Sequence, residues 1–132
     1  MTGLPALTVA RLDHVVLRVT DIDRALAFYT GLLGMAELRR VERLGLVQLR
    51  AGASMLDLVP GTPAPGPDGR NMDHVCFRID PWDEAAIRDL LARHGIEAAA
   101  TATRFGAEGD GPSIYISDPD GNTVELKGPA GA

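Results

Sequence analysis

Apolar and polar positions along the chain follow one pattern that occurs twice. The stretch LDHVVLRV, residues 12–19, returns as MDHVCFRI at residues 72–79, with Asp, His, Val and Arg in the same places. Each stretch is a mainly apolar run of strand length. Apolar residues at helical spacing follow each run, in residues 22–33 and in residues 82–94. The pattern therefore predicts a strand followed by a helix at two places in the chain.

The residues around each helical segment indicate where the two helices begin and end. Thr20 or Asp21 can cap the first helix, because short polar side chains accept hydrogen bonds from first-turn amides, and Gly34 is expected to end it. Asp80 is expected to cap the second helix, with Pro81 in the first helical position.

Three strand-like segments follow each predicted helix. They are residues 35–42, 46–50 and 54–59 in the first copy and residues 96–103, 113–117 and 123–127 in the second. Turn sequences, RAGAS and DPDGN, separate the last two segments of each copy. The second copy also carries a Gly-rich stretch, RFGAEGDG, which is expected to form a loop before its third strand. The repeated unit is therefore βαβββ, and the fold class is α+β.

The length of 132 residues suits one compact domain, residues 1–132, with a core of its own. We expect module one at about residues 10–59 and module two at about residues 71–128. The stretch PGTPAPGPDGR, residues 60–70, is too rich in Pro and Gly to form a regular element and is expected to link the modules.

Composition and charge narrow the possible partners and location. The net charge of −5 argues against a nucleic-acid partner, and no apolar run is long enough to span a membrane. The first residues lack a basic segment followed by a long apolar stretch, so no signal peptide is expected. Cys76 is the single cysteine, so no intrachain disulfide can form. A cytoplasmic location follows as the simplest expectation.

The repeated histidine and arginine point to a shared site. Side chains alternate along a strand, so His14 and Arg18 share one face, and His74 and Arg78 share the equivalent face of the second copy. Duplicated modules of this kind normally pair about a pseudo-twofold axis. The two histidines are then expected to meet across one cavity. The arginines either pair with carboxylates or bind an anionic substrate.

A carboxylate lies in an apolar run in the last strand of each module. These residues are Asp57 in SMLDLVP and Glu125 in NTVELKG. Two histidines and two carboxylates at matched positions form a set of metal ligands suited to one divalent ion, such as Zn, Ni, Mn, Fe or Co. The alternative is a duplicated β fold in which the histidines only form hydrogen bonds.

The sequence over residues 12–127 resembles the vicinal oxygen chelate superfamily, which has the glyoxalase and bleomycin-resistance fold. LDHVVLRVTDIDRALAFYTGLLGM resembles the first unit of that family, and DPDGNTVEL resembles its ending phrase. The resemblance implies an open, mixed eight-stranded, barrel-like cup formed by two paired modules. It implies a metal held by His14, His74 and Glu125, with Asp57 at the position of a fourth ligand, and a homodimer that acts on a small molecule.

The resemblance leaves several activities open. A glyoxalase I-like reading uses all four ligands, with Glu125 or Asp57 as the catalytic base and Arg18 near a substrate carboxylate, although Gly61 replaces the asparagine of those enzymes. A fosfomycin-resistance reading uses three ligands, with Ser113 and Tyr115 as substrate contacts.

Two features speak against the fosfomycin-resistance reading. Val16 replaces its activating threonine, and RFGAEGDG has no lysine. A dioxygenase is a third reading, and a non-catalytic binder related to bleomycin-resistance proteins is a fourth. We expect a metal-dependent, glyoxalase-like lyase or isomerase that acts on a small oxygenated, anionic substrate, with Arg18 and Arg78 among its substrate contacts.

Overall fold

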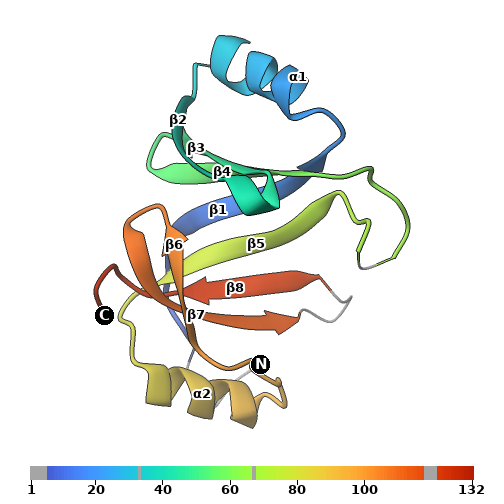
Figure 1. Cartoon of the computed structure of the whole chain (residues 1–132). Coiled ribbons are helices and arrows are strands. Elements are labelled where there is room, and N and C mark those ends of the chain that lie inside the picture. The colour runs from blue at the N-terminus through green and yellow to red at the C-terminus, as the bar shows by residue number, and fades with distance from the viewer. Residues whose placement is uncertain (1–5, 33, 67, 118–121) are drawn as a thin grey trace. The chain divides into compact units, whose positions relative to one another are not determined.

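The computed structural model describes residues 6–32, 34–66, 68–117 and 122–132. In these residues the regular structure consists of eight strands and two α-helices, with a π-helical turn at Ala27–Leu32 and a 3-10 turn at Glu42–Leu44 (Figure 1). The elements are β1 (Val9–Val19), α1 (Ile22–Leu26), β2 (Ala36–Val41), β3 (Leu46–Ala51), β4 (Ser54–Pro60), β5 (Met72–Ile79), α2 (Glu84–Arg93), β6 (Ala102–Gly106), β7 (Gly109–Ser117) and β8 (Thr123–Lys127).

The strands belong to one mixed sheet with the order β2-β3-β4-β1-β5-β8-β7-β6. Strands β1 and β4 are parallel, whereas β2, β3 and β4 pair antiparallel, as do β6, β7 and β8. A short helical segment follows the first strand of each βαβββ repeat. The expected α+β fold class with eight strands is therefore confirmed. None of the helices in the described ranges is long and apolar enough to cross a membrane.

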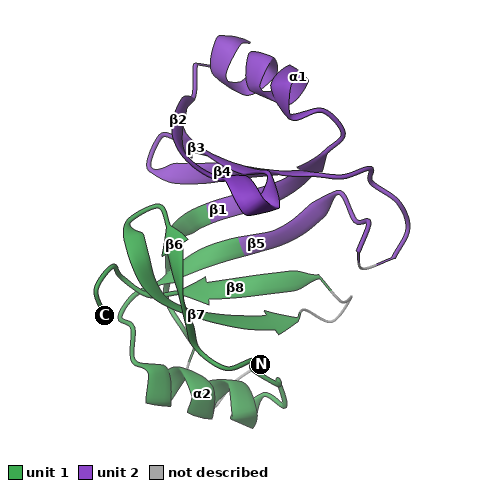
Figure 2. Cartoon of the chain, in the orientation of Figure 1, with its two compact units in different colours: residues 1–13, 76–132 green, residues 14–75 purple. Residues whose placement is uncertain are grey.

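The chain divides into two compact units (Figure 2). Unit 2 comprises residues 14–75. Unit 1 comprises residues 1–13 and 76–132.

Unit 2 has an apolar core on one side of its strands. Alternate residues of β3 and β4 supply the buried cluster, which α1 and the turn after it cover. The buried members are Val47, Leu49, Leu56 and Leu58. Because alternate side chains point the other way, Asp57 faces the opposite side of β4.

Unit 1 has its own core beneath α2. The buried members are Ile79, Ile87, Leu91, Ile114 and Leu126. Trp82 and Ile116 pack against this cluster. The apolar periodicity of residues 82–94 thus corresponds to a helix with one buried face, as predicted.

The helix boundaries differ in part from the sequence expectation. Asp21 caps α1 as predicted, since its carboxylate accepts a hydrogen bond from the Arg24 amide at 3.0 Å. Beyond Leu26 the helix continues as a π-helical turn over Ala27–Leu32. The expected cap of α2 at Asp80 is wrong. Asp83 holds that position, and its carboxylate accepts from the Ala86 amide at 3.1 Å.

Residues 96–111 show the largest departure from the prediction. The expected strand over residues 96–103 is wrong, because β6 begins only at Ala102. The Gly-rich stretch that was expected to be a loop instead forms a hairpin between β6 and β7. Gly109 has a φ of 110°, a left-handed conformation that favours glycine, directly after the two-residue turn. The predicted turn at DPDGN lies largely outside the described residues.

Candidate functional site

The two repeated histidines of unit 2 face each other. His14 on β1 and His74 on β5 approach with their Nε2 atoms 3.0 Å apart. Their rings are perpendicular, and the ring centroids lie 5.1 Å apart. Both residues are buried, with 3% and 8% of their surface exposed. At this separation one Nε2 carries a hydrogen and donates a hydrogen bond, which the lone pair of the other Nε2 accepts. The meeting of the two histidines that the repeat predicted is therefore present within unit 2.

Asp73 decides which tautomer His74 adopts. The Asp73 Oδ2 atom lies 2.9 Å from the His74 Nδ1 atom. An ionised carboxylate only accepts hydrogen bonds, so Nδ1 of His74 carries the proton. In the neutral ring this leaves the lone pair on Nε2, which is the atom directed at His14. The same arrangement orients metal-binding histidines in many proteins.

Arg18 holds the other oxygen of the Asp73 carboxylate. Its guanidinium donates to Asp73 Oδ1 at 3.2 Å and to the Arg70 carbonyl at 3.1 Å. A hydrogen-bonded chain thus runs from Arg18 through Asp73 to the histidine pair. Sequence reasoning missed Asp73, although the repeated dipeptide Asp-His was a visible signal. Asp13, its counterpart in the repeat, does something else in unit 1, where it accepts from the Ala107 amide at 3.0 Å.

Asp57 is buried on β4 and bonded to a glutamine that sequence reasoning also missed. Gln48 donates from Nε2 to Asp57 Oδ2 at 3.0 Å, and the two residues face each other across β3 and β4. Asp57 is also paired with Val16 on β1, two residues from His14, so it shares the histidine face of the strands. The Gln48 Oε1 atom is buried without a hydrogen-bond partner in the described residues. A buried oxygen of this kind is suited to accept a hydrogen bond from a ligand or to bind a cation.

In unit 1, Glu125 is held by a serine on the neighbouring strand. Its side chain is 1% exposed, and Ser113 donates from Oγ to Glu125 Oε2 at 2.8 Å. Ser113 is itself fully buried. Tyr115 lies directly opposite Glu125 in the β7–β8 register, so the two side chains share one face of these strands.

Arg104 on β6 completes this cluster and was missed by sequence reasoning. Its guanidinium donates from Nη1 to Ser113 Oγ at 3.0 Å. It also lies over the Tyr115 ring, with Cζ 4.3 Å from the ring centroid, which is the geometry of a cation–π contact. The sequence signal was weak because Arg104 belongs to the stretch that was read as a loop.

Arg78 pairs with a carboxylate within unit 1. It donates from Nε to Glu108 Oε2 at 2.7 Å, and its side chain is only 11% exposed. Arg11 bonds the same carboxylate oxygen. Glu108 lies in the β6–β7 turn, so these two ion pairs attach the hairpin to β1 and β5.

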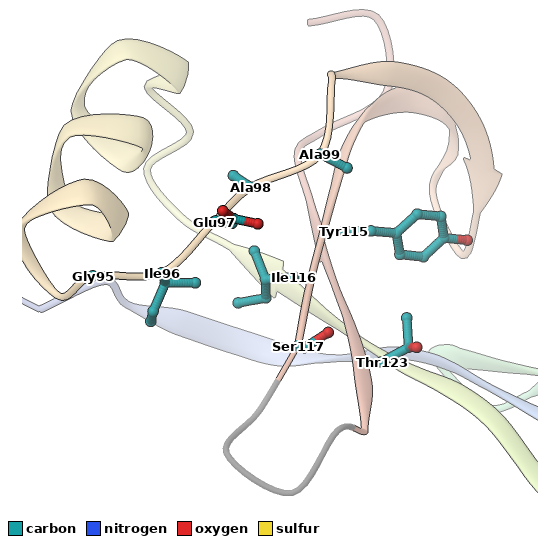
Figure 3. Close-up of a pocket in the computed structure, with 9 residues that line it drawn as sticks. All are labelled: Gly95, Ile96, Glu97, Ala98, Ala99, Tyr115, Ile116, Ser117 and Thr123. Carbon is teal, nitrogen blue, oxygen red and sulfur yellow. The ribbon is translucent and has the colours of Figure 1, made fainter. Parts of the chain in front are cut away.

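A cavity of about 710 Å³ opens elsewhere in unit 1 (Figure 3). It lies between the segment after α2 and the end of β7, and residues such as Ile96, Ile116 and Thr123 line it. Tyr115 is the one expected site residue in its lining. Figure 3 shows the side chains of Tyr115 and Ile116 leaving β7 on opposite sides. Because this cavity offers neither histidine, we do not assign the chemistry to it.

The donor atoms fit a divalent metal ion. Two buried imidazole nitrogens, one with its lone pair fixed by Asp73, and buried carboxylates are the ligands preferred by Zn, Ni, Mn and Fe. No thiolate set of a structural zinc site accompanies them, since Cys76 is the single cysteine of the chain.

Comparison with known proteins identifies the family. The model of the Glyoxalase/Bleomycin resistance protein/Dioxygenase superfamily matches residues 11–126. The chain therefore belongs to this superfamily, as its resemblance to vicinal oxygen chelate proteins implied.

Individual relatives cover most of the chain. Virulence protein STM3117 of Salmonella typhimurium is 28% identical over 88% of this chain and 82% of its own length. Lactoylglutathione lyase of the same organism is 31% identical over 88% of this chain and 90% of its own length.

Solved structures share the fold at lower identity. Methylmalonyl-CoA epimerase from Mycobacterium tuberculosis matches 97% of this chain and 93% of its own with a TM-score of 0.66 and 22% identity. The Mn(II)-bound glyoxalase from Novosphingobium aromaticivorans matches 93% of this chain and 40% of its own with a TM-score of 0.74 and 20% identity.

Proposed function

We propose that this protein is a metal-dependent lyase or isomerase of the glyoxalase type, acting on a small oxygenated, anionic substrate. Its single divalent ion would be bound by His14, His74 and Glu125, with Asp57 as a fourth ligand. The observation that carries the proposal is the buried histidine pair with its fixed tautomer. Burial of two histidines beside a carboxylate is costly for a purely structural purpose, whereas metal binding uses each of these atoms.

The chemistry assigned to the residues follows from their types. A bound divalent ion supplies a Lewis acid for an oxyanion that develops on the substrate. A carboxylate, Glu125 or Asp57, would take a proton from a carbon next to a carbonyl group and return it to the neighbouring atom. Ser113 would keep Glu125 oriented while the proton moves, because its hydroxyl donates a hydrogen bond to the Oε2 atom of Glu125.

The substrate contacts expected from the sequence are part of the proposal. Ser113 and Tyr115 lie on the Glu125 face of β7, which supports a role beside the reacting atoms. Arg18 and Arg78 would contribute positive charge near the site, each through a guanidinium that a carboxylate already holds in place. We also propose a cytoplasmic homodimer, on the basis of the single cysteine and the proline-rich linker.

The similarity to a named lactoylglutathione lyase selects the first activity to test. Metal-free protein would be loaded separately with Ni, Zn, Mn, Co and Fe(II) and assayed with the hemithioacetal of methylglyoxal and glutathione. We expect turnover with at least one ion and its loss in His74→Ala. Asp68→Asn, an exposed change in the same unit, serves as the control. Turnover that persists in both His74→Ala and Glu125→Ala would overturn the proposed site.

A fosfomycin-resistance type of activity is the second candidate. The specific observation in its favour is the cluster of Ser113, Tyr115 and Arg104, which places hydroxyl and guanidinium donors next to Glu125. Assaying the same metal-loaded samples for addition of glutathione to fosfomycin separates the two reactions. Binding of substrate without turnover in either assay would favour a non-catalytic binder.

A further inference from the structure

Arg104 differs from the other arginines of unit 1 in its electrostatic partners. Four arginines in the described part of this unit form ion pairs with carboxylates, namely Arg11 and Arg78 with Glu108, Arg88 with Glu84, and Arg93 with Asp89. Arg104 bonds only neutral groups among the residues described, the hydroxyl and carbonyl of Ser113 and the ring of Tyr115. In the described residues its guanidinium therefore has no direct ion pair, and the nearby Glu125 carboxylate is reached only through the Ser113 hydroxyl.

The position of Arg104 places this charge on the face of unit 1 that carries Glu125. In the β6–β7 register Arg104 pairs with Gly111 and Ala102 pairs with Ser113, so Arg104 and Ser113 share one face. The β7–β8 register adds Tyr115 and Glu125 to that face. The space in front of Gly111 is filled, because a Cβ there would lie 2.5 Å from the Pro129 carbonyl oxygen and 3.1 Å from Lys127 Nζ.

The contacts that orient the Arg104 guanidinium involve only some of its N–H groups. An arginine has five N–H groups, and those of Nη1 bond Ser113. The Tyr115 ring lies 4.3 Å from the Arg104 Cζ atom and packs against the guanidinium. The Nε and Nη2 donors form the edge that remains, and two parallel N–H groups of this kind bind carboxylates and phosphonates in a bidentate manner.

Lys127 is the other cation on this face, and it is closed to a ligand. It is 1% exposed and donates from Nζ to the Gly109 carbonyl at 3.3 Å. Arg104 is half-buried, so it combines a partly desolvated charge with access from outside.

From these observations we infer that Arg104 is a substrate-binding residue that takes the oxyanion group, a carboxylate or a phosphonate, of the substrate. This inference rests on the proposed function, because it names the part of the substrate that binds next to Glu125. It adds a residue to the expected set of Arg18 and Arg78, whose charges are balanced by Asp73 and Glu108. The bond from Arg104 to Ser113 also links the bound anion to Glu125.

The test adds methylphosphonate or acetate as a probe to the metal-free protein, and binding is followed by NMR and calorimetry. We expect saturable binding by the wild type, with a shift of the Arg104 Nε–H resonance. Arg104→Met should weaken binding by at least about tenfold, and Arg104→Lys less, since a charged hydrogen bond of 1.5–3 kcal/mol corresponds to that range. Arg93→Met is the matched control, because Arg93 is exposed and pairs with Asp89, and it should bind like the wild type.

Three results would overturn the inference. They are the absence of saturable binding by the wild type, equal binding by Arg104→Met, and equal weakening in Arg93→Met. If Arg104→Met does not fold, the Arg104 Nε–H shift in the wild-type protein decides alone. Metal affinity measured on the same samples distinguishes failure of the proposed metal-dependent function from failure of the proposed role of Arg104. Probe binding through Arg104 without metal binding would refute the proposed function only, and metal binding without an Arg104 effect would refute this inference only.

Discussion

Asp73 is the residue on which the orientation of His74 depends. It accepts from Nδ1 of His74 at 2.9 Å and from Arg18 at 3.2 Å. Asp73→Asn should lower the affinity for a divalent ion by about 10–100-fold, because the ring loses the charged partner that keeps its lone pair on Nε2. Calorimetric titration with Zn²⁺ measures the effect.

Asp68→Asn is the control for this change, since Asp68 carries the same charge in the same unit and is exposed. An Asp73→Asn protein that binds Zn²⁺ as tightly as the control would show that His74 is oriented by other contacts.

At the residue scale, the sequence indicated which residues are candidates for the site better than it indicated their hydrogen-bond partners. The repeat predicted His14, His74, Asp57 and Glu125 as candidate ligands, because matched positions under one symmetry operation are visible in one sequence. It could not identify the partners of Arg18, because Asp73 is separated from it by 55 positions. Gln48 was not visible for a similar reason, since its proximity to Asp57 depends on the register between β3 and β4.

At the scale of the elements, the packing of the β6–β7 hairpin in unit 1 can be tested at Gly106. A Cβ at Gly106 would lie 2.6 Å from Asp13 Oδ1 and 2.7 Å from Lys127 Cε. Both neighbours are buried, so Gly106→Ala should destabilise the protein by about 1–3 kcal/mol, the usual cost of overpacking. Chemical denaturation measures this loss.

Gly31→Ala is the matched change, because nothing lies within 4 Å of a Cβ at that position. It should leave the free energy of unfolding unchanged or raise it slightly. A Gly106→Ala protein as stable as Gly31→Ala would mean that the hairpin does not pack on Asp13 as described.

Helix α2 is attached to the irregular segment that follows it through Glu84. The hydrogen bond from Thr101 and the one from Arg88 hold the pKa of Glu84 below its ordinary value of 4.5. A lowered folded-state pKa stabilises the protein above the unfolded-state pKa, and this contribution is lost as the pH falls through the folded-state value. Glu84→Gln should therefore lower the Tm at pH 7, and its effect should shrink as the pH falls through the folded-state pKa of Glu84. An equal difference in Tm above and below that pKa would show that the carboxylate charge is not involved.

The sequence predicted most elements but not their limits around residue 100. The apolar run after α2 has strand composition, yet within it only Ala99 donates to β7, to the Tyr115 carbonyl at 3.0 Å. The Arg88 side chain donates a hydrogen bond to the Ala99 carbonyl at 2.9 Å, so this segment is bonded to α2 instead of pairing as a strand of the sheet. Such a side-chain interaction across 11 positions is not encoded in the alternation of apolar residues.

For the whole molecule, the arrangement of modules determines how a site is assembled. The linker of residues 60–70 is rich in proline, and extended linkers allow modules to be exchanged between two chains. Exchange at this linker would pair His14 of one chain with His74 of its partner, whereas here the two histidines meet within one chain. In an exchanged homodimer, His14→Ala and Glu125→Ala chains mixed together would form one intact site and one doubly damaged site, and activity would return to about half of the wild-type value per heterodimer. No recovery after verified subunit exchange would mean that each site is built within one chain.

Binding of a divalent ion at equilibrium tests the central claim most directly. Chelator-treated protein is titrated with Zn²⁺ and Ni²⁺, and the bound metal is counted against protein concentration. The account predicts one ion per chain in the wild type and a loss of affinity of more than about 100-fold in both His74→Ala and Glu125→Ala, with Asp68→Asn unchanged. Absence of stoichiometric binding by the wild type, or equal binding by either ligand variant, would contradict it.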